Sequence, residues 1–247
     1  MTPSATAPML CATAVSGEAL MTSVTPSAED PAEDPAGGFP GRPARPPTAR
    51  QALLRAARAA LHDRPWPRVR MAEVAAAAGF SRQTLYSEFG SKDGLGTALV
   101  ARELEILLDR AARAAQLAAR SASRPASGPA PDPVAGCAAA AVSVVRAACR
   151  DPLVRAALTG CWDSRLPPPG PEADRAAAGL RDRTAAALVS AGVTADGATG
   201  PAALCHACEV GLRLALSYVV APCDGPPEAT EEAAATHVTQ VLRALLR

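Results

Sequence analysis

The chain has 247 residues, and its 25 basic and 24 acidic residues leave a formal net charge of only +1. Alanine supplies much of the hydrophobic content and aromatic residues make up only 3%, which favours a core of many small contacts between helices. No uninterrupted apolar stretch is long enough to span a membrane, and the first residues lack the pattern of a secretory signal. We therefore expect a soluble, cytoplasmic protein without membrane contact.

The charges are unevenly distributed along the chain. Residues 1–41 carry five acids and no base, whereas residues 42–92 carry ten bases and three acids. A compact basic stretch in a neutral protein indicates a polyanionic partner for that stretch. A solvated charged face explains the charge alone equally well, so a second feature has to decide between the two readings.

The first 45 residues are rich in Pro, Ala, Ser, Thr and acids, which predicts a disordered tail. The first helix is expected to begin at Thr48, because Thr48 and Gln51 have the spacing of a capping box. Apolar residues then recur at helical spacing until Pro65 and Pro67 end the helix.

Two short helices follow, joined by a tight turn. The first is expected from about Met71 to Ala78, with Gly79 ending it in a left-handed conformation. Ser81 then caps a helix that runs to Phe89. Such a pair matches a helix-turn-helix motif, in which the second helix enters the major groove of DNA.

The remainder of the chain also predicts helices. A long one is expected from Ser91 to about residue 119. Further helical stretches are expected at residues 133–150, 152–161, 171–191, 199–220 and 229–246. No alternating strand pattern of useful length occurs, so the predicted fold is all-α with about nine helices.

The second helix of the motif carries side chains suited to DNA. Arg82 and Gln83 lie in its first turn and can hydrogen-bond to base edges. Thr84, Tyr86 and Lys92 offer groups that contact phosphates. The residues that we expect at the DNA interface are Ser81, Arg82, Gln83, Thr84, Tyr86, Ser87 and Lys92.

The stretch "MAEVAAAAGFSRQTLYSEFGSKDGL", preceded by "RQALLRAARAAL", resembles the DNA-binding domain of TetR-type transcriptional regulators. The shared pattern covers about residues 48–110 and includes Ala-Gly-apolar-Ser, Thr-apolar-Tyr, Phe and Ser-Lys before an acid. The Pro65-Trp66-Pro67 turn is stiffer than the usual Gly-containing turn of the family, and two single positions also depart from the pattern. Arg70 stands where the family usually has a capping Thr or Ser, which predicts a looser helix start. Gln83 stands where Gly is frequent, so no operator sequence is inherited.

The resemblance implies a tail at 1–45, a three-helix DNA-binding domain at 46–95 and a helical ligand-binding and dimerisation domain at 96–247. It implies a repressor that binds a palindromic double-stranded DNA operator as a homodimer and is released by a small molecule. The dimer is expected through about residues 199–220 and 229–246. Gly94 and Gly96, near the start of the long helix, suggest either a hinge or simply a weak helix start.

The face of helix 199–220 that carries Leu204, Cys208, Gly211, Ala215 and Val219 fits a dimer interface. Packing within one chain explains this face nearly as well.

The apolar composition of residues 133–220 favours an apolar effector. Its pocket is expected near Trp162, Cys161, Cys149 and Cys208, although a core tryptophan is the alternative. Cys205 and Cys208 invite a metal or thiol-sensing interpretation, but a structural zinc site needs more ligands, so core cysteines are favoured. We expect no metal and no cofactor.

Two other functions remain as alternatives. An enzyme is disfavoured because none of the three histidines stands beside a plausible nucleophile and no phosphate-binding glycine motif occurs. We therefore expect no catalytic residues. A DNA-binding protein that is controlled by a partner protein, or by nothing, is the other alternative.

Overall fold

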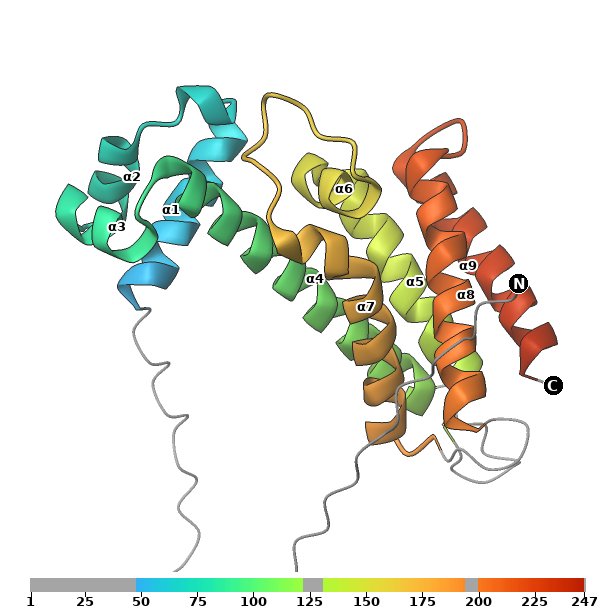
Figure 1. The fold of residues 1–247 in the computed structure, drawn as a ribbon. Coiled ribbons are helices and arrows are strands. Elements are labelled where there is room, and N and C mark those ends of the chain that lie inside the picture. The colour runs from blue at the N-terminus through green and yellow to red at the C-terminus, as the bar shows by residue number, and fades with distance from the viewer. Residues whose placement is uncertain (1–47, 122–130, 194–199, 247) are drawn as a thin grey trace, which may run out of the picture. The chain divides into compact units, whose positions relative to one another are not determined.

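A computed structural model describes residues 48–121, 131–193 and 200–246. These residues form α-helices and one short 3-10 helix, with no strand among them, so the predicted all-α class is confirmed (Figure 1). The acidic tail expected at residues 1–45 lies outside the described residues.

The first helix, α1 (Ala49–Asp63), begins as expected. Thr48 Oγ1 accepts a hydrogen bond from the Gln51 N–H at 3.3 Å, and Gln51 Oε1 accepts one from the Thr48 N–H at 3.2 Å. This capping box satisfies backbone donors that a helix start otherwise leaves free. After Pro65 the chain forms a short 3-10 helix, η1 (Trp66–Arg68), which the sequence analysis did not predict and which buries the Trp66 ring.

The helix-turn-helix is formed by α2 (Met71–Ala78) and α3 (Arg82–Phe89). Gly79 ends α2 with a φ of 77°, a conformation that a residue with a Cβ rarely adopts. Ser81 Oγ accepts a hydrogen bond from the Thr84 N–H at 3.0 Å and thereby caps α3. Arg70 makes no side-chain cap on α2, as its departure from the family pattern predicts.

The long helix α4 (Lys92–Ser121) follows, with Ser91 Oγ accepting from the Gly94 N–H at 3.0 Å. The remaining helices are α5 (Pro133–Arg150), α6 (Pro152–Thr159), α7 (Pro171–Ser190), α8 (Pro201–Val220) and α9 (Pro227–Leu245). Helix α6 ends earlier than expected because Gly160 adopts a φ of 72°. Helix α9 begins earlier because Pro227 fits the first helical position.

Helix α5 is the centre of the C-terminal bundle. It packs against α4 on one side and against α8 and α9 on the other (Figure 1). Gly136 permits the close approach to α4, because a Cβ there would lie 2.9 Å from the Ala115 carbonyl oxygen. Helices α5 and α8 are also long and apolar enough to cross a membrane by length and composition. Both helices pack in this helical bundle, and core helices of soluble proteins can be equally long and apolar.

Gly94 and Gly96 are explained by crowding. A Cβ on Gly94 would overlap the backbone carbonyl oxygen of Phe89. A Cβ on Gly96 would lie 2.9 Å from Pro167, 3.0 Å from Pro168 and 3.0 Å from the Trp66 ring. Close packing between α4, η1 and the loop before α7 therefore accounts for the Gly96 position without a hinge.

The apolar face of α8 packs inside the protomer. Its five residues are buried, and the helix contacts α5 and α9. Of the two explanations left open for this face, packing within one chain is the one that the structure supports. The more exposed apolar side chains at the ends of α8 and α9 are Val220, Val241 and Leu245, with exposed fractions of 70%, 37% and 43%.

Candidate nucleic-acid interface

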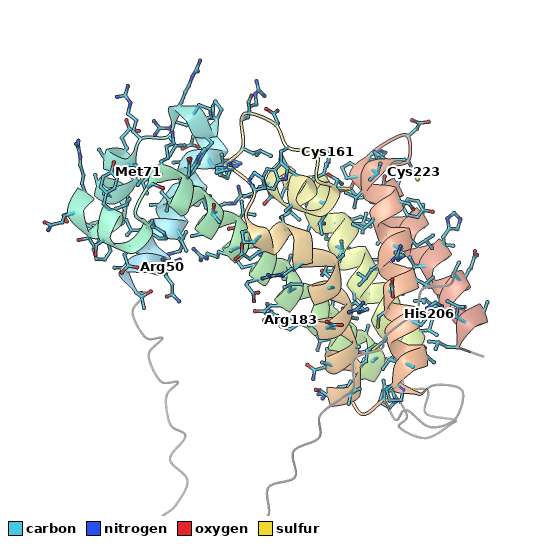
Figure 2. The ribbon with its side chains drawn as sticks, in the orientation of Figure 1. Arg50, Met71, Cys161, Arg183, His206 and Cys223 are labelled. Atoms are coloured by element: carbon cyan, nitrogen blue, oxygen red, sulfur yellow. The ribbon has the colours of Figure 1, made fainter. Side chains whose placement is uncertain are left out.

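Helix α3 is held on its scaffold by two apolar side chains. Leu85 is fully buried in the core that α1 and α2 share with α3. Phe89 is half-buried, and the Arg50 guanidinium of α1 stacks 4.6 Å from the centre of its ring. Arg50 also donates a hydrogen bond to the Glu88 carbonyl oxygen at 3.0 Å, so it fastens α1 to the end of α3 (Figure 2).

The opposite face of α3 is open to solvent. Arg82, Gln83 and Ser87 are exposed, and Tyr86 is 49% exposed. The structure thus places these predicted DNA contacts together on one free helix face.

Ser81 and Thr84 are tied to each other at the start of α3. Their hydroxyl oxygens lie 2.9 Å apart, in addition to the cap that Ser81 makes on the Thr84 N–H. Both hydroxyls therefore have a role in stabilising the helix start, and Thr84 is only partly exposed.

Lys92 lies at the start of α4 and reaches back to η1. Its ammonium group donates a hydrogen bond to the Pro67 carbonyl oxygen at 3.0 Å and lies 5.6 Å from the centre of the Trp66 ring. A cation over an indole ring is electrostatically favourable. These contacts hold the only lysine of the chain in a defined place.

Two arginines beside the motif were not among the predicted contacts. Arg68 is exposed in η1, and the side chain of Arg70, 79% exposed, stands at the start of α2. Both lie in the basic stretch 42–92, but in a chain with 24 arginines the arginine count alone did not single them out. Arg70 stands at a helix start, a position where phosphate contacts are common.

The four residues expected around an effector lie on different elements of the C-terminal part of the chain. Cys208 is buried and faces α5, whereas Cys161 is exposed to solvent. Trp162 is half-buried against the core, as the alternative interpretation held. Cys149 lies near the end of α5, whereas Cys161 and Trp162 lie between α6 and α7. A single pocket at Trp162, Cys161, Cys149 and Cys208 stays a prediction.

The buried cysteine pair joins α5 and α8. Cys137 Sγ lies 3.2 Å from Cys208 Sγ. The thiol that Cys208 contacts therefore belongs to Cys137 and not to Cys205, with which the sequence analysis had grouped it. The hydrogen bond between Cys137 and Cys208, together with burial, raises the pKa of the Cys137 thiol. Since the thiolate is the reactive form, this thiol is a poor nucleophile at neutral pH. No group of three metal-ligating side chains occurs among the residues that the structure describes.

An ion-pair cluster links α1 to the C-terminal bundle. The Arg58 guanidinium hydrogen-bonds to Asp151, which caps α6, and its Nε lies 3.7 Å from Glu103 Oε2 in α4. Asp151 Oδ1 also accepts a hydrogen bond from the Leu153 N–H at 2.9 Å. One side chain of the first helix therefore contacts both α4 and α6.

Glu103 gives this cluster a pH dependence. Burial raises the pKa of its carboxyl group, and the Arg58 guanidinium only partly opposes the shift. Between the unfolded and the folded pKa the folded state binds more protons, so stability increases as the pH falls through that window. We expect the free energy of unfolding of Glu103→Gln to equal or exceed that of the wild type at about pH 7. This advantage of the variant should be lost at about pH 5. Melting temperatures at both pH values test this, and an unchanged pH response would contradict it.

The geometry of α1 to α3 defines a helix-turn-helix domain with a free, polar second helix. A family model described as bacterial regulatory proteins of the tetR family matches residues 53–99. Over 60 residues the chain is 43% identical to the HTH-type transcriptional regulator AlkX of Mycobacterium tuberculosis (strain ATCC 25618 / H37Rv). That match covers 24% of this chain and 28% of AlkX, so it spans little more than a quarter of the relative.

One solved structure shares the overall fold, and a second is similar to a lesser degree. A TetR-family transcriptional regulator from Mesorhizobium loti MAFF303099 has a TM-score of 0.51 and 19% identity, over 79% of this chain and 95% of that one. The TetR family repressor AlkX from Dietzia sp. strain DQ12-45-1b has a TM-score of 0.47 and 22% identity, over 81% and 98%. Residues 53–99 therefore carry a DNA-binding domain of the tetR type.

Proposed function

We propose that the chain binds a palindromic operator in double-stranded DNA and thereby represses transcription in the cytoplasm. The observation that carries this proposal is the outer face of α3, where Arg82 and Gln83 are exposed in the first turn while Leu85 fixes the helix from behind. Arginine pairs with guanine and glutamine with adenine in the major groove. These two side chains are the proposed sequence-reading residues.

Phosphate contacts are proposed on both sides of α3. Tyr86 and Ser87 extend from α3 itself, and Lys92 stands at the start of the next helix. Arg70 adds an exposed guanidinium at the start of α2. Contacts of this kind fix the orientation of a protein on DNA without reading its sequence.

The proposed operator-binding form is a homodimer through α8 and α9. The exposed side chains of Val220, Val241 and Leu245 lie on these helices and provide apolar surface for a second copy. A twofold axis there would present two α3 helices to half-sites about 34–36 Å apart. A small molecule that favours another spacing would release the DNA.

A selection from random DNA duplexes tests this function. We expect enrichment of an inverted repeat whose half-sites are centred about 10 base pairs apart, or a multiple of that distance. Enrichment of a sequence without internal symmetry would contradict the dimeric mode of binding. Absence of any enriched sequence would contradict the regulator itself.

Lys92→Ala should weaken binding to specific and unrelated DNA alike. Each phosphate contact contributes about 1 unit to the slope of log affinity against log salt concentration, so we expect the slope to fall by about that amount. Fluorescence anisotropy at several salt concentrations measures it. Arg113→Ala, at an exposed position of α4, is the control. A slope equal to that of the control would show that Lys92 contacts Pro67 but no phosphate.

A further inference from the structure

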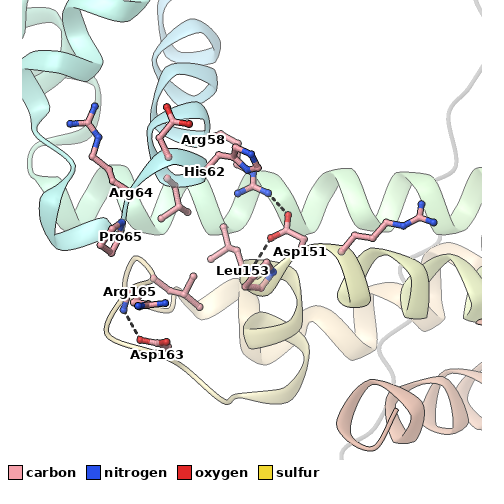
Figure 3. Close-up of a pocket in the computed structure, with 13 residues that line it drawn as sticks. Arg58, His62, Arg64, Pro65, Asp151, Leu153, Asp163 and Arg165 are labelled. Atoms are coloured by element: carbon pink, nitrogen blue, oxygen red, sulfur yellow. Dashed lines mark hydrogen bonds and ion pairs between the residues drawn. The ribbon is translucent and has the colours of Figure 1, made fainter. Parts of the chain in front are cut away.

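A cavity of about 550 Å³ lies where the end of α1, the start of α6 and the loop at 163–166 meet (Figure 3). This volume falls in the range of small-molecule sites. Helix α1 belongs to the proposed DNA-binding domain, whereas α6 and the loop belong to the C-terminal part of the chain. An occupant of the cavity would therefore touch both.

Asp63, Asp151 and Asp163 line the cavity, and the last two are engaged in hydrogen bonds. Asp151 is held by Arg58 and by the Leu153 N–H. Asp163 Oδ1 accepts a hydrogen bond from the Arg165 N–H at 2.8 Å and one from the Ser164 hydroxyl at 3.3 Å. These carboxylates are therefore poor partners for a further cation.

The guanidinium of Arg165 remains available. Four arginines and His62 line the cavity. Three of these arginines pair with a carboxylate. Among the residues that the structure describes, no carboxylate oxygen lies within ion-pair distance of the fourth, Arg165. Figure 3 shows Arg165 on the loop and His62 on α1, on opposite sides of the cavity. The planar guanidinium matches the two oxygens of a carboxylate. The cavity thus offers a positive group to an incoming anion.

The remaining lining is aliphatic. Leu61, Leu153 and Leu166 contribute apolar side chains, together with Pro65 and Pro152, and no aromatic residue lines the cavity. Such a surface suits the hydrocarbon part of a ligand and offers no ring for stacking.

We propose that this cavity is the effector site and that it binds a small aliphatic carboxylate, with the carboxylate on Arg165 and the hydrocarbon chain against Leu61, Leu153 and Leu166. The inference rests on the proposed function, because it names the effector of the same regulator. It replaces the pocket expected at Trp162 and adds a negative charge to the apolar ligand expected there.

Two contacts connect this site to the DNA-binding domain. Arg58 lines the cavity and joins α1 to α6 through Asp151, so an occupant of the cavity lies beside this link. The Arg165 carbonyl oxygen accepts a hydrogen bond from the Trp66 N–H at 2.7 Å, which ties the loop to η1. A ligand that favours one arrangement of these contacts shifts the position of α1 to α3 and hence the affinity for DNA.

Calorimetric titration with octanoate tests the site directly, with 1-octanol as the uncharged control. We expect saturable binding of octanoate with one site per chain, and binding of 1-octanol at least ~10-fold weaker, because the charged contact is lost. Arg165→Ala should reduce octanoate affinity to a similar degree, and Arg165→Lys less, because the charge remains. Arg175→Ala, at an exposed position of α7 outside the cavity, should bind as the wild type does. The Arg165 backbone carbonyl is unchanged in these variants, so the tie to Trp66 persists.

Absence of octanoate binding, equal binding of 1-octanol, or unchanged binding by Arg165→Ala would each overturn the site. Octanoate should also change the affinity for the selected DNA duplex at least fivefold, the lower end of typical allosteric coupling. This change should disappear in Arg165→Ala. An affinity for the selected duplex that bound octanoate leaves unchanged would overturn the effector role. Because the titration needs no DNA, a protein that binds octanoate but no duplex would contradict the proposed function and leave the site standing.

Discussion

Arg82→Ala and Gln83→Ala should each weaken binding to the preferred duplex about 10- to 100-fold and leave binding to unrelated duplexes nearly unchanged. A bidentate contact to a base contributes about 1–3 kcal/mol of discrimination, which corresponds to this range. Both side chains are exposed, so their removal leaves no cavity in the core. Arg82 stands at the positive end of the α3 dipole, where a cation does not stabilise the helix, so Arg82→Ala should fold normally.

Fluorescence anisotropy with the preferred duplex and with a scrambled one separates base reading from general attraction. Arg113→Ala serves as the matched control, since it removes the same charge from an exposed position far along α4. Equal weakening on both duplexes would show that Arg82 and Gln83 contact phosphates and do not read bases.

Gly96→Ala should destabilise the protein by about 1–3 kcal/mol, the usual cost of adding a methyl group to a well-packed site. The added Cβ would lie 2.9–3.0 Å from two prolines and the Trp66 ring, and rigid proline rings cannot turn away. The effect should exceed the roughly 1 kcal/mol that alanine gains over glycine inside a helix.

Gly179→Ala in α7 is the matched control for this substitution. Its Cβ would meet only Leu108, at 3.4 Å, which is ordinary van der Waals contact. We expect this variant to gain up to about 1 kcal/mol from helix propensity. Chemical denaturation of both variants gives the comparison. Equal stability changes would show that the position of Gly96 is not crowded and would revive the hinge interpretation.

Local signals predicted the local structure well. Thr48, Gly79 and Ser81 each act within a few residues of themselves, so their spacing alone indicated where α1 begins, where α2 ends and where α3 begins. The same holds for Leu85, whose burial follows from helical periodicity. Because Leu85 occupies the inward face of α3, Arg82 could be expected on the outward face.

Contacts between distant segments could not be predicted in this way. Periodicity indicated that one face of α8 is buried but not which helix covers it, and Cys208 proved to face Cys137, 71 residues earlier. The contact of Lys92 with Pro67 depends on η1, a turn without a clear pattern.

The cavity beside Arg165 is the clearest example of this limit. Its lining residues come from the end of α1, the start of α6 and the following loop, and no short motif unites them. The hydrogen bond from the Trp66 backbone N–H to the Arg165 carbonyl oxygen and the Arg58–Asp151 ion pair bring the segments together. The sequence analysis placed the effector near Trp162, which is close in sequence to this loop, but no pattern indicated the cavity itself.

The central claim is that α3 reads a specific DNA site, and a mobility shift with the intergenic DNA upstream of the protein's own gene tests it most directly. We predict a discrete complex that persists in excess unrelated DNA and is lost when Arg82 and Gln83 are both replaced by alanine. A complex that unrelated DNA removes as readily as specific DNA does, or one that survives the double substitution, would contradict the account.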